Sequence, residues 1–213
     1  NLKKIGKRPL LWWTLDSAKK SKYIDEIYVS SDSSKILNYS KKHKAETIKR
    51  PKNISNHLAT KRDVIYHTLN CLKKKVNFFD FLIYLQPTSP LRTSYHIDYA
   101  LNKIFKKKIS GLVSVSKQSD DTLWKIKVKN NIILNDTGKN KNFAKRSQDL
   151  KKIYRPNGAI FIFNLKKLKY KNQFDISKGF QIYEMDRLSS IDIDEYYDFN
   201  LADLILKKRK RKN

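Results

Sequence analysis

The sequence predicts one α/β domain in which helices flank a mostly parallel sheet. Short β-branched and aromatic segments alternate with longer segments whose apolar residues recur at helical spacing, as in folds built from strand–helix–strand units. One segment, 81–85, is an unbroken apolar run, which is typical of a strand covered on both faces by helices. With 213 residues, the chain can bury one substantial core.

The first half of the chain supports this fold with a regular order of elements. Pro9 suits the first turn of a helix, where its missing N–H costs nothing. We expect helices at 9–20, 34–43 and 60–74, and strands at 26–30, 45–48 and 81–85. The strand at 81–85 is expected to be central and buried in the sheet.

The second half continues the pattern with one interruption. We expect helices at 94–107 and 197–205, strands at 111–116, 159–163 and 181–183, a turn at 154–158, and an inserted hairpin with a flexible flap at 117–153. Strands at 123–128 and 132–134 would form the hairpin. The domain would span 1–206, and the basic tail 207–213 would be a frayed terminus.

Composition excludes several classes of protein. No apolar run approaches the ~18 residues that a membrane-spanning helix needs, so no membrane association is expected. Cys71 is the only cysteine, which excludes a disulfide framework and fits a reducing compartment, most simply the cytoplasm. The 47 Lys and Arg against 20 Asp and Glu give a charge of +27, which attracts polyanions. Because the lysines are spread over polar helix faces, we favour a compositional bias over a specific nucleic-acid surface.

The carboxyl end of the 81–85 strand is the first candidate site. Gln86 is the first polar residue there, and ligands of open α/β sheets bind outside the carboxyl ends of strands. Pro87 and Pro90 bracket a turn with two hydroxyl residues. The alternative is that Gln86 only caps the strand and that the hydroxyls only make turn hydrogen bonds.

A second candidate site is the pair Asp192 and Asp194. In an extended backbone the two carboxylates share one face, while the isoleucines between and before them point to the core. Paired carboxylates repel unless a cation lies between them, and Mg²⁺ on a phosphate-bearing substrate is a common solution. The alternative is an edge strand whose acids face water.

The arginines, histidines and glycines provide weaker evidence for a site. Arg50, Arg92 and Arg155 stand at element ends and offer planar forks for a carboxylate or phosphate. None of the four histidines has metal-ligand spacing or a nucleophile partner, and the five glycines form neither a Walker loop nor a Gly-x-Gly-x-x-Gly fingerprint.

Five motifs together resemble a known family. They are Arg50-Pro51, the run from Leu85 to Arg92 (Leu-Gln-Pro-Thr-Ser-Pro-Leu-Arg), Arg146 to Leu150 (Arg-Ser-Gln-Asp-Leu), Tyr154 to Ile160 (Tyr-Arg-Pro-Asn-Gly-Ala-Ile), and Ser190 to Asp194 with Asp198-Phe199. In this order and spacing they are similar to the acylneuraminate cytidylyltransferases, which make CMP-activated nonulosonic acids such as CMP-sialic acid. The resemblance covers nearly the whole chain.

The resemblance implies a nucleotide-diphospho-sugar transferase (Rossmann-like) fold and a homodimer. It also implies a cytoplasmic enzyme of cell-surface polysaccharide biosynthesis that joins CMP from CTP to an acidic nonulosonic sugar, with Mg²⁺ and release of pyrophosphate. The sugar would be sialic, legionaminic, pseudaminic or octulosonic acid. A basic nucleic-acid-binding protein and an inactive remnant kept for dimerisation are the alternatives.

The resemblance also implies roles for individual residues. By motif, the catalytic and metal-binding residues would be Asp192 and Asp194; the nucleotide-binding residues Asn1, Arg50, Thr60 and Lys61; the sugar-binding residues Gln86, Arg155, Asn157 and Phe161; and further candidates Arg146 and Gln148.

The sequence departs from the family at several places, two of which concern the nucleotide; Phe161 and Lys151 also stand where family members often have Tyr and Pro. Family members have a first strand and an Ala-Arg-Gly-Gly-Ser-Lys-Arg type loop around the triphosphate, and this chain begins at Asn1, which would just follow that loop. His57 to Lys61 stands where the family has Asp-Thr-Ala-Ser-Ser. We therefore expect this chain to fold and dimerise, to leave one position open in the sheet, and to transfer cytidylyl groups poorly.

Overall fold

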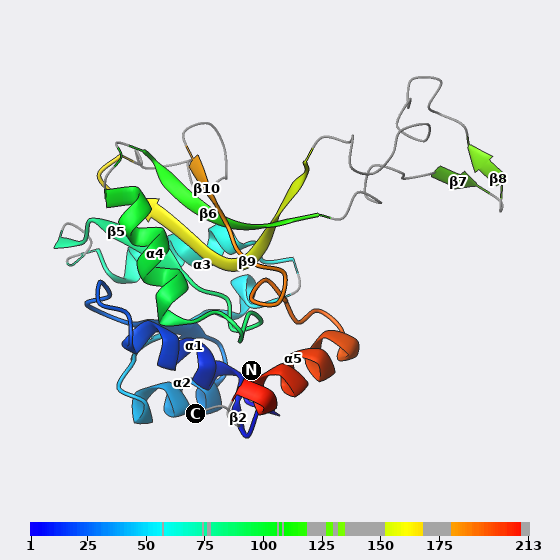
Figure 1. Cartoon of the computed structure of the whole chain (residues 1–213). Coiled ribbons are helices and arrows are strands. Elements are labelled where there is room, and N and C mark those ends of the chain that lie inside the picture. Colours follow the sequence, from blue (N-terminus) through cyan, green and yellow to red (C-terminus); the bar gives the residue numbers. More distant parts are fainter. Residues whose placement is uncertain are drawn as a thin grey trace.

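A computed structural model of the chain shows how these elements are arranged (Figure 1). It describes residues 1–56, 58–73, 75, 78–105, 107, 109–118, 127–129, 132–134, 152–167 and 180–209.

A four-stranded sheet forms the centre of the molecule. Its strands lie in the order β10 (Phe180–Glu184), β6 (Gly111–Lys117), β9 (Tyr154–Asn164) and β5 (Phe81–Tyr84). β10 runs parallel to β6, whereas β9 is antiparallel to both β6 and β5. The predicted α/β class with flanking helices is confirmed, and the sheet is mixed because β9 runs against both of its neighbours.

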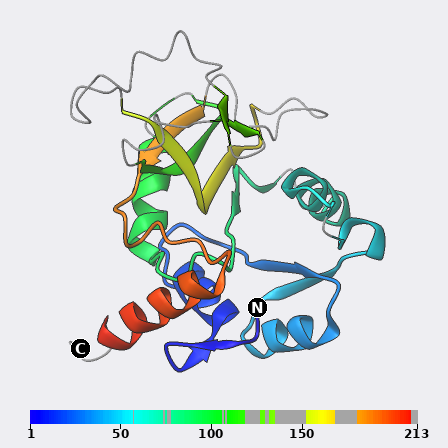
Figure 2. The same ribbon diagram turned by 90° about the vertical axis from the view of Figure 1, so that its right-hand side faces the viewer.

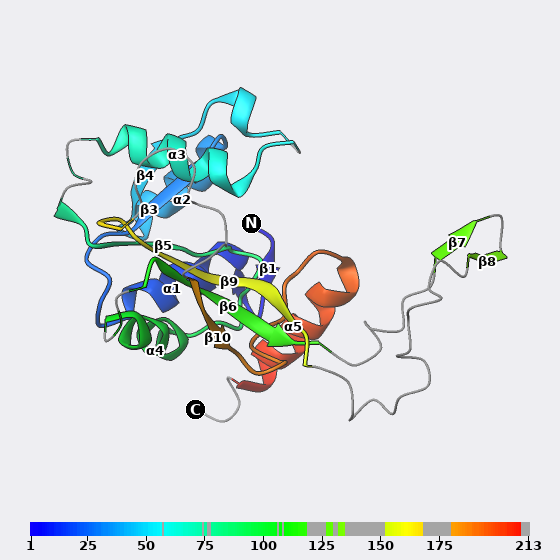
Figure 3. The same ribbon diagram turned by 90° about the horizontal axis from the view of Figure 1, so that it is seen from above.

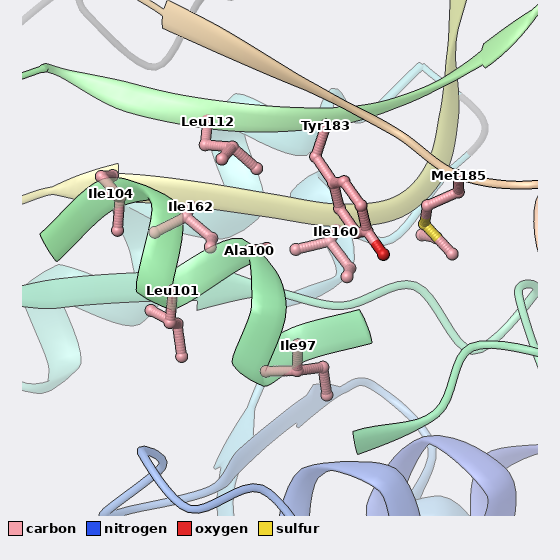
Figure 4. Close-up of a cluster of buried hydrophobic side chains, with 10 residues drawn as sticks. Ile97, Ala100, Leu101, Ile104, Leu112, Ile160, Ile162, Tyr183 and Met185 are labelled. Carbon is pink, nitrogen blue, oxygen red and sulfur yellow. The ribbon is translucent and has the colours of Figure 1, made fainter. Parts of the chain in front are cut away.

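The two faces of this sheet are covered by different helices. Along β9, Ile160 and Ile162 pack with α4 (Ser94–Phe105), as Figure 4 shows, whereas Phe161 and Phe163 pack with Ile65 of α3 (Lys61–Cys71). Successive side chains of a strand point to opposite faces, so this alternation means that both faces of β9 are buried. Each fully buried side chain of this kind stabilises the fold by about 1.5–3 kcal/mol.

A second, smaller sheet lies beside the first. It consists of β3 (Tyr28–Ser31) and β4 (Glu46–Lys49), which pair in parallel around the crossover helix α2 (Ser34–Lys42). Helix α1 (Leu10–Lys19) packs against this unit through Leu11 and Leu15. Figure 2 shows the two-stranded sheet to one side of β5.

The chain ends pack together. A short antiparallel hairpin of β1 (Lys4–Ile5) and β2 (Arg8–Pro9), which the sequence did not predict, precedes α1. Helix α5 (Tyr196–Arg209) buries Ala202 and Leu206 against Ile5, Leu10 and Leu91. The 3-10 turn η1 (Lys52–Ile54) completes the described helical elements, none of which is long and apolar enough to cross a membrane.

The prediction that 81–85 is a central strand is wrong. Within the described part of the chain, β5 pairs with β9 on one side and with no strand on the other, and its four residues are only partly buried. An apolar run indicates that helices cover both faces of a strand, and α3 and α4 do cover the two faces of this sheet. It carries no information about the number of neighbouring strands.

The predicted turn at 154–158 is also wrong, because these residues open strand β9. The pairing of β6 with β9 shifts register between Val113 and Val115, opposite this stretch. Gly158 has φ +76° there. A glycine at positive φ is typical of a β-bulge, so the Asn157-Gly158 signal marks a bulge.

The predicted hairpin is confirmed by the antiparallel pair β7 (Lys127–Lys129) and β8 (Ile132–Leu134). The predicted flap lies outside the described residues.

At the C-terminal end, residues 207–209 belong to α5, where Lys207 pairs with Asp203 at 2.5 Å. The prediction of a frayed tail is therefore wrong for these residues. Cations in the last helical turn complement the helix dipole.

One buried arginine links three elements. Arg92 is 2% exposed, and its Nη1 donates to the carbonyl oxygens of Gln86 (3.1 Å) and Ala159 (2.9 Å). Its Nη2 donates to the Thr14 hydroxyl of α1 at 2.7 Å. The sequence-based interpretation of Arg92 as a fork for a ligand is therefore not supported, because the fork is directed to the protein itself.

We predict that Arg92→Met lowers the free energy of unfolding by about 3 kcal/mol, because it leaves two carbonyl groups and a hydroxyl without their buried donor. Urea denaturation measures the loss. Arg187→Met, at an exposed arginine, is the matched control and should cost little. Equal stability of the Arg92 and Arg187 variants would contradict the role of Arg92 as a structural link.

Candidate functional site

The candidate site is centred on Gly158, where Gln86 and Asp192 approach the backbone of β9. A Cβ atom at Gly158 would lie 2.7 Å from Asp192 Oδ2 and 2.8 Å from Gln86 Oε1. Only a residue without a side chain permits this approach, and φ +76° at the bulge also favours glycine. The structure thus brings the two sequence-predicted sites, the end of the 81–85 strand and the Asp192 segment, to one place.

Backbone hydrogen bonds hold the Asp192 segment against the turn after β5. The Ile193 N–H donates to the Thr88 carbonyl oxygen at 2.9 Å. Ile191 and Ile193 pack against the cluster beneath α5, as the alternating pattern predicts, although the segment forms no strand. Asp198 Oδ2 accepts from the backbone N–H of Asp194 (3.2 Å) and of Glu195 (2.9 Å), which fixes the start of α5.

The electrostatic surroundings of Asp192 are mixed. Burial raises the pKa of its carboxyl group, and the negative charge of the neighbouring Asp194 raises it further. A hydrogen bond from the Thr88 hydroxyl and the positive charges of Lys61 and Arg155 act in the opposite direction on this pKa. Asp192 is therefore a desolvated carboxylate with cations nearby, an arrangement common at sites that bind charged ligands.

Two buried oxygen atoms in this cluster have no partner among the described residues. They are Gln86 Oε1 and Asp192 Oδ1. Buried polar atoms are nearly always hydrogen-bonded, so two such oxygens beside the same glycine point to a ligand. Both are hard oxygen donors, the type that Mg²⁺ prefers.

The described residues contain no group of three or more His, Cys, Asp or Glu that could enclose a metal ion. A site with one or two carboxylates fits Mg²⁺, because this ion usually keeps several waters and shares its remaining positions with substrate phosphates. Asp192 and Asp194 therefore fit a Mg²⁺ ion that arrives with a phosphate-bearing substrate.

The structure shows Asn157 and Phe161, two predicted sugar-binding residues, in contacts with the protein itself. The Asn157 Oδ1 atom accepts from the Ser114 hydroxyl (2.6 Å) and the Ala159 N–H, and its Nδ2 donates to Ser190 Oγ at 2.9 Å. Because both ends of this buried amide are occupied, Asn157 positions the bulge and the Ser190 segment. Phe161 is 4% exposed and belongs to the core beneath α3.

Of the predicted nucleotide-binding residues, Lys61 lies nearest the cluster. Its Nζ lies 4.7 Å from the centre of the Phe161 ring. Thr60 caps α3: its Oγ1 accepts from the Asp63 N–H while the Asp63 carboxylate accepts from the Thr60 N–H, a capping box that explains the preference for threonine here. The positive charge of Arg50 acts on the half-buried Tyr84 at the end of β5.

The remaining predicted residues are Asn1, Arg155, Arg146 and Gln148. The carbonyl oxygen of Asn1 accepts from the Leu11 N–H at 2.9 Å, beside the start of α1. Arg155 is exposed on β9, opposite Ser116. Arg146 and Gln148 lie outside the described residues.

Two contributors had not been assigned a role from the sequence. Thr88 had been noted only as a turn hydroxyl, yet it contacts the Asp192 segment through its carbonyl oxygen and its side chain. Asp198 had been noted only as part of a motif, although an acid in the first turn of a predicted helix is a recognisable cap signal.

Comparisons with known proteins agree with this geometry. A family model described as cytidylyltransferase matches residues 1–205. The N-acylneuraminate cytidylyltransferase of Escherichia coli O18:K1:H7 is 29% identical over 208 residues, which are 96% of this chain and 47% of that protein. The chain thus spans about half the length of this relative.

Other matches extend over most of both proteins. The CMP-N,N'-diacetyllegionaminic acid synthase of Legionella pneumophila is 30% identical over 217 residues, covering 97% of this chain and 88% of that protein. The solved structure of a CMP:2-keto-3-deoxy-manno-octonic acid synthetase complexed with CTP has a TM-score of 0.61 at 12% identity, covering 86% of this chain and 82% of that one. The fold, the site and the match over 1–205 agree: the chain belongs to the cytidylyltransferase family.

Proposed function

We propose that the protein transfers the cytidylyl group of CTP to an acidic nonulosonic sugar and releases pyrophosphate. The observation that carries this proposal is that Gln86 and Asp192 converge on Gly158 in a chain of this family, and that each has a buried oxygen, Oε1 and Oδ1, without a partner among the described residues. Relatives named for N-acylneuraminate and N,N'-diacetyllegionaminic acid support an acid sugar as the acceptor.

In the proposed reaction a hydroxyl oxygen of the sugar attacks the α-phosphorus of CTP. A new P–O bond forms, the bond between the α- and β-phosphates breaks, and the proton of the hydroxyl is released to solvent or base. No covalent bond to the protein is formed. The protein therefore contributes by positioning the reactants and by neutralising charge.

We propose that Asp192 and Asp194 hold Mg²⁺, which would neutralise charge on the phosphate oxygens when bound. Asp192 is held in place by Thr88 and by the packing of Ile193, and its Oδ1 has no hydrogen-bond partner among the described residues. Because burial and the charge of Asp194 raise the pKa of Asp192, a bound cation also offsets the repulsion between the two acids.

Lys61 and Arg155 supply positive charge near Asp192. Both charges act on the Asp192 carboxyl group, which places them within electrostatic reach of anything bound there. We assign Arg155 to the sugar carboxylate, Lys61 to the nucleotide phosphates and Gln86 to orienting the sugar. The homodimer and the cytoplasmic location stay predictions from the family resemblance.

The direct test is formation of a CMP-sugar and of pyrophosphate from CTP, Mg²⁺ and a panel of sialic, legionaminic, pseudaminic and octulosonic acids. Product with any member of the panel supports the proposal. Binding of CTP without product from any acid sugar would instead favour an inactive member of the family.

We predict that Asp192→Asn and Asp194→Asn each lower Mg²⁺-dependent turnover by a hundredfold or more, about 3 kcal/mol of transition-state stabilisation, because each removes a proposed metal ligand. Asp186→Asn, at an acid on the same connection, is the control. Turnover that stays unchanged at saturating Mg²⁺ in either variant would exclude the metal assignment.

We also predict that Gln86→Ala and Arg155→Ala weaken binding of the acid sugar by about 2–4 kcal/mol and that of CTP far less, since a charge-assisted contact with the sugar is lost. Separate titrations of the two substrates measure the difference. If both affinities fell equally, Gln86 and Arg155 would act on the strand edge rather than on the sugar.

A further inference from the structure

A cavity of about 390 Å³ lies between α1, the start of α4 and the last turn of α5. Pockets of this size hold small organic ligands. Its apolar wall includes Trp12 and Trp13 of α1, Pro90 of the turn after β5 and Leu206 of α5. The two indoles meet edge to face, with ring centres 5.0 Å apart, and give the cavity a rigid aromatic side.

The polar part of the lining is positively charged. Lys20, Arg92 and Arg209 contribute three cations, and Asp16 contributes one acid that pairs with Lys20 at 2.8 Å. Two positive charges are therefore left without an acidic partner in the lining. Arg209 is held in place because its Nη1 donates to the Leu91 carbonyl oxygen at 3.1 Å.

Arg92 contributes a buried positive charge to the lining, although its hydrogen bonds go to the protein. Its Nη1 and Nη2 atoms donate to the protein, but its buried Nε atom has no hydrogen-bond partner among the described residues. Burial lowers the pKa of the guanidinium, since desolvation disfavours its charge. An anion beside this group would offset that cost.

The cavity differs from the candidate site in its lining. None of its lining residues belongs to the cluster around Gly158, although Arg92 also donates to the carbonyl oxygens of Gln86 and Ala159 next to that cluster. Asp194 precedes the first turn of α5, whereas Leu206 and Arg209 lie in its last turns. A helix rises 1.5 Å per residue, so about 15–20 Å of helix separate Leu206 and Arg209 from the Asp194 end.

We propose that the cavity is a binding site for a small organic anion with a planar aromatic body. The indoles, Pro90 and Leu206 would receive the ring, and Arg209 would face the negative group, with the buried charge of Arg92 adding to the positive potential. The charge complementarity selects an anion over a neutral ligand, and the aromatic wall selects a ring over a simple inorganic ion.

The test uses naphthalene-1-sulfonate as the probe with the whole chain at physiological ionic strength. We expect saturable binding by calorimetry and shifts of the Trp12 and Trp13 indole N–H signals in NMR spectra. Two matched probes separate the contributions: the neutral 1-naphthalenemethanol lacks the charge, and methanesulfonate lacks the ring. Each should bind at least about tenfold more weakly, since each loses one kind of contact.

Two pairs of variants locate the binding. Arg209→Gln should weaken the probe about tenfold, whereas Lys208→Gln, which removes the same charge from the neighbouring position outside the lining, should leave it unchanged. Trp12→Leu removes one of the two indoles of the aromatic wall without changing charge and should also weaken the probe. Asp192→Asn, at the candidate site, should have no effect.

Thermal unfolding of each variant checks that the fold is kept. Equal weakening in Arg209→Gln and Lys208→Gln would show that the probe responds only to the overall charge of +27 and would overturn the proposal. Binding without saturation, or without a response of the two indole signals, would overturn it as well.

Discussion

The candidate site depends on the close approach of Gln86 and Asp192 across the bare backbone of Gly158. Both side-chain oxygens would lie under 3 Å from a Cβ atom at this position, so the contact exists only because the residue is glycine. The bulge in β9 sets its positive φ, and Asn157 holds the bulge through Ser114 and Ser190. Segments distant in the sequence thus meet at one backbone position. Figure 3 shows the paired strands β5 and β9 from above.

The sequence singled out side chains that the structure brings together, but it predicted the topology less well. Gln86, Asp192 and Asp194 were singled out because a polar residue ends an apolar run and because acids alternate with isoleucines. The edge position of β5 was missed because helices covering both faces produce the same apolar run in an edge strand as in a central one. Asn157-Gly158 favours positive φ in a turn and in a bulge alike, and only the pairing with β6 distinguishes the two.

Other residues show that the type of a residue and its position in the sequence do not determine its role. Arg92 and Arg155 stand in similar contexts at element ends, yet Arg92 is buried and bound to backbone carbonyls, whereas Arg155 is exposed on β9 with its charge acting on Asp192. The excess of lysine also says little about function, because residue type alone does not determine a role. Lys61 is distinguished from the other lysines by its place over Phe161 beside the Asp192 carboxyl, and sequence alone does not reveal this.

The most direct measurement of the central claim is Mg²⁺-dependent CMP-sugar formation by Gly158→Ala. The account predicts a loss of turnover of at least about a hundredfold, because the new methyl group displaces both Gln86 and Asp192. Stability should fall by only about 1–2 kcal/mol, the cost of alanine at positive φ. A folded Gly158→Ala variant with unchanged turnover would contradict the claim that the site is built on this approach.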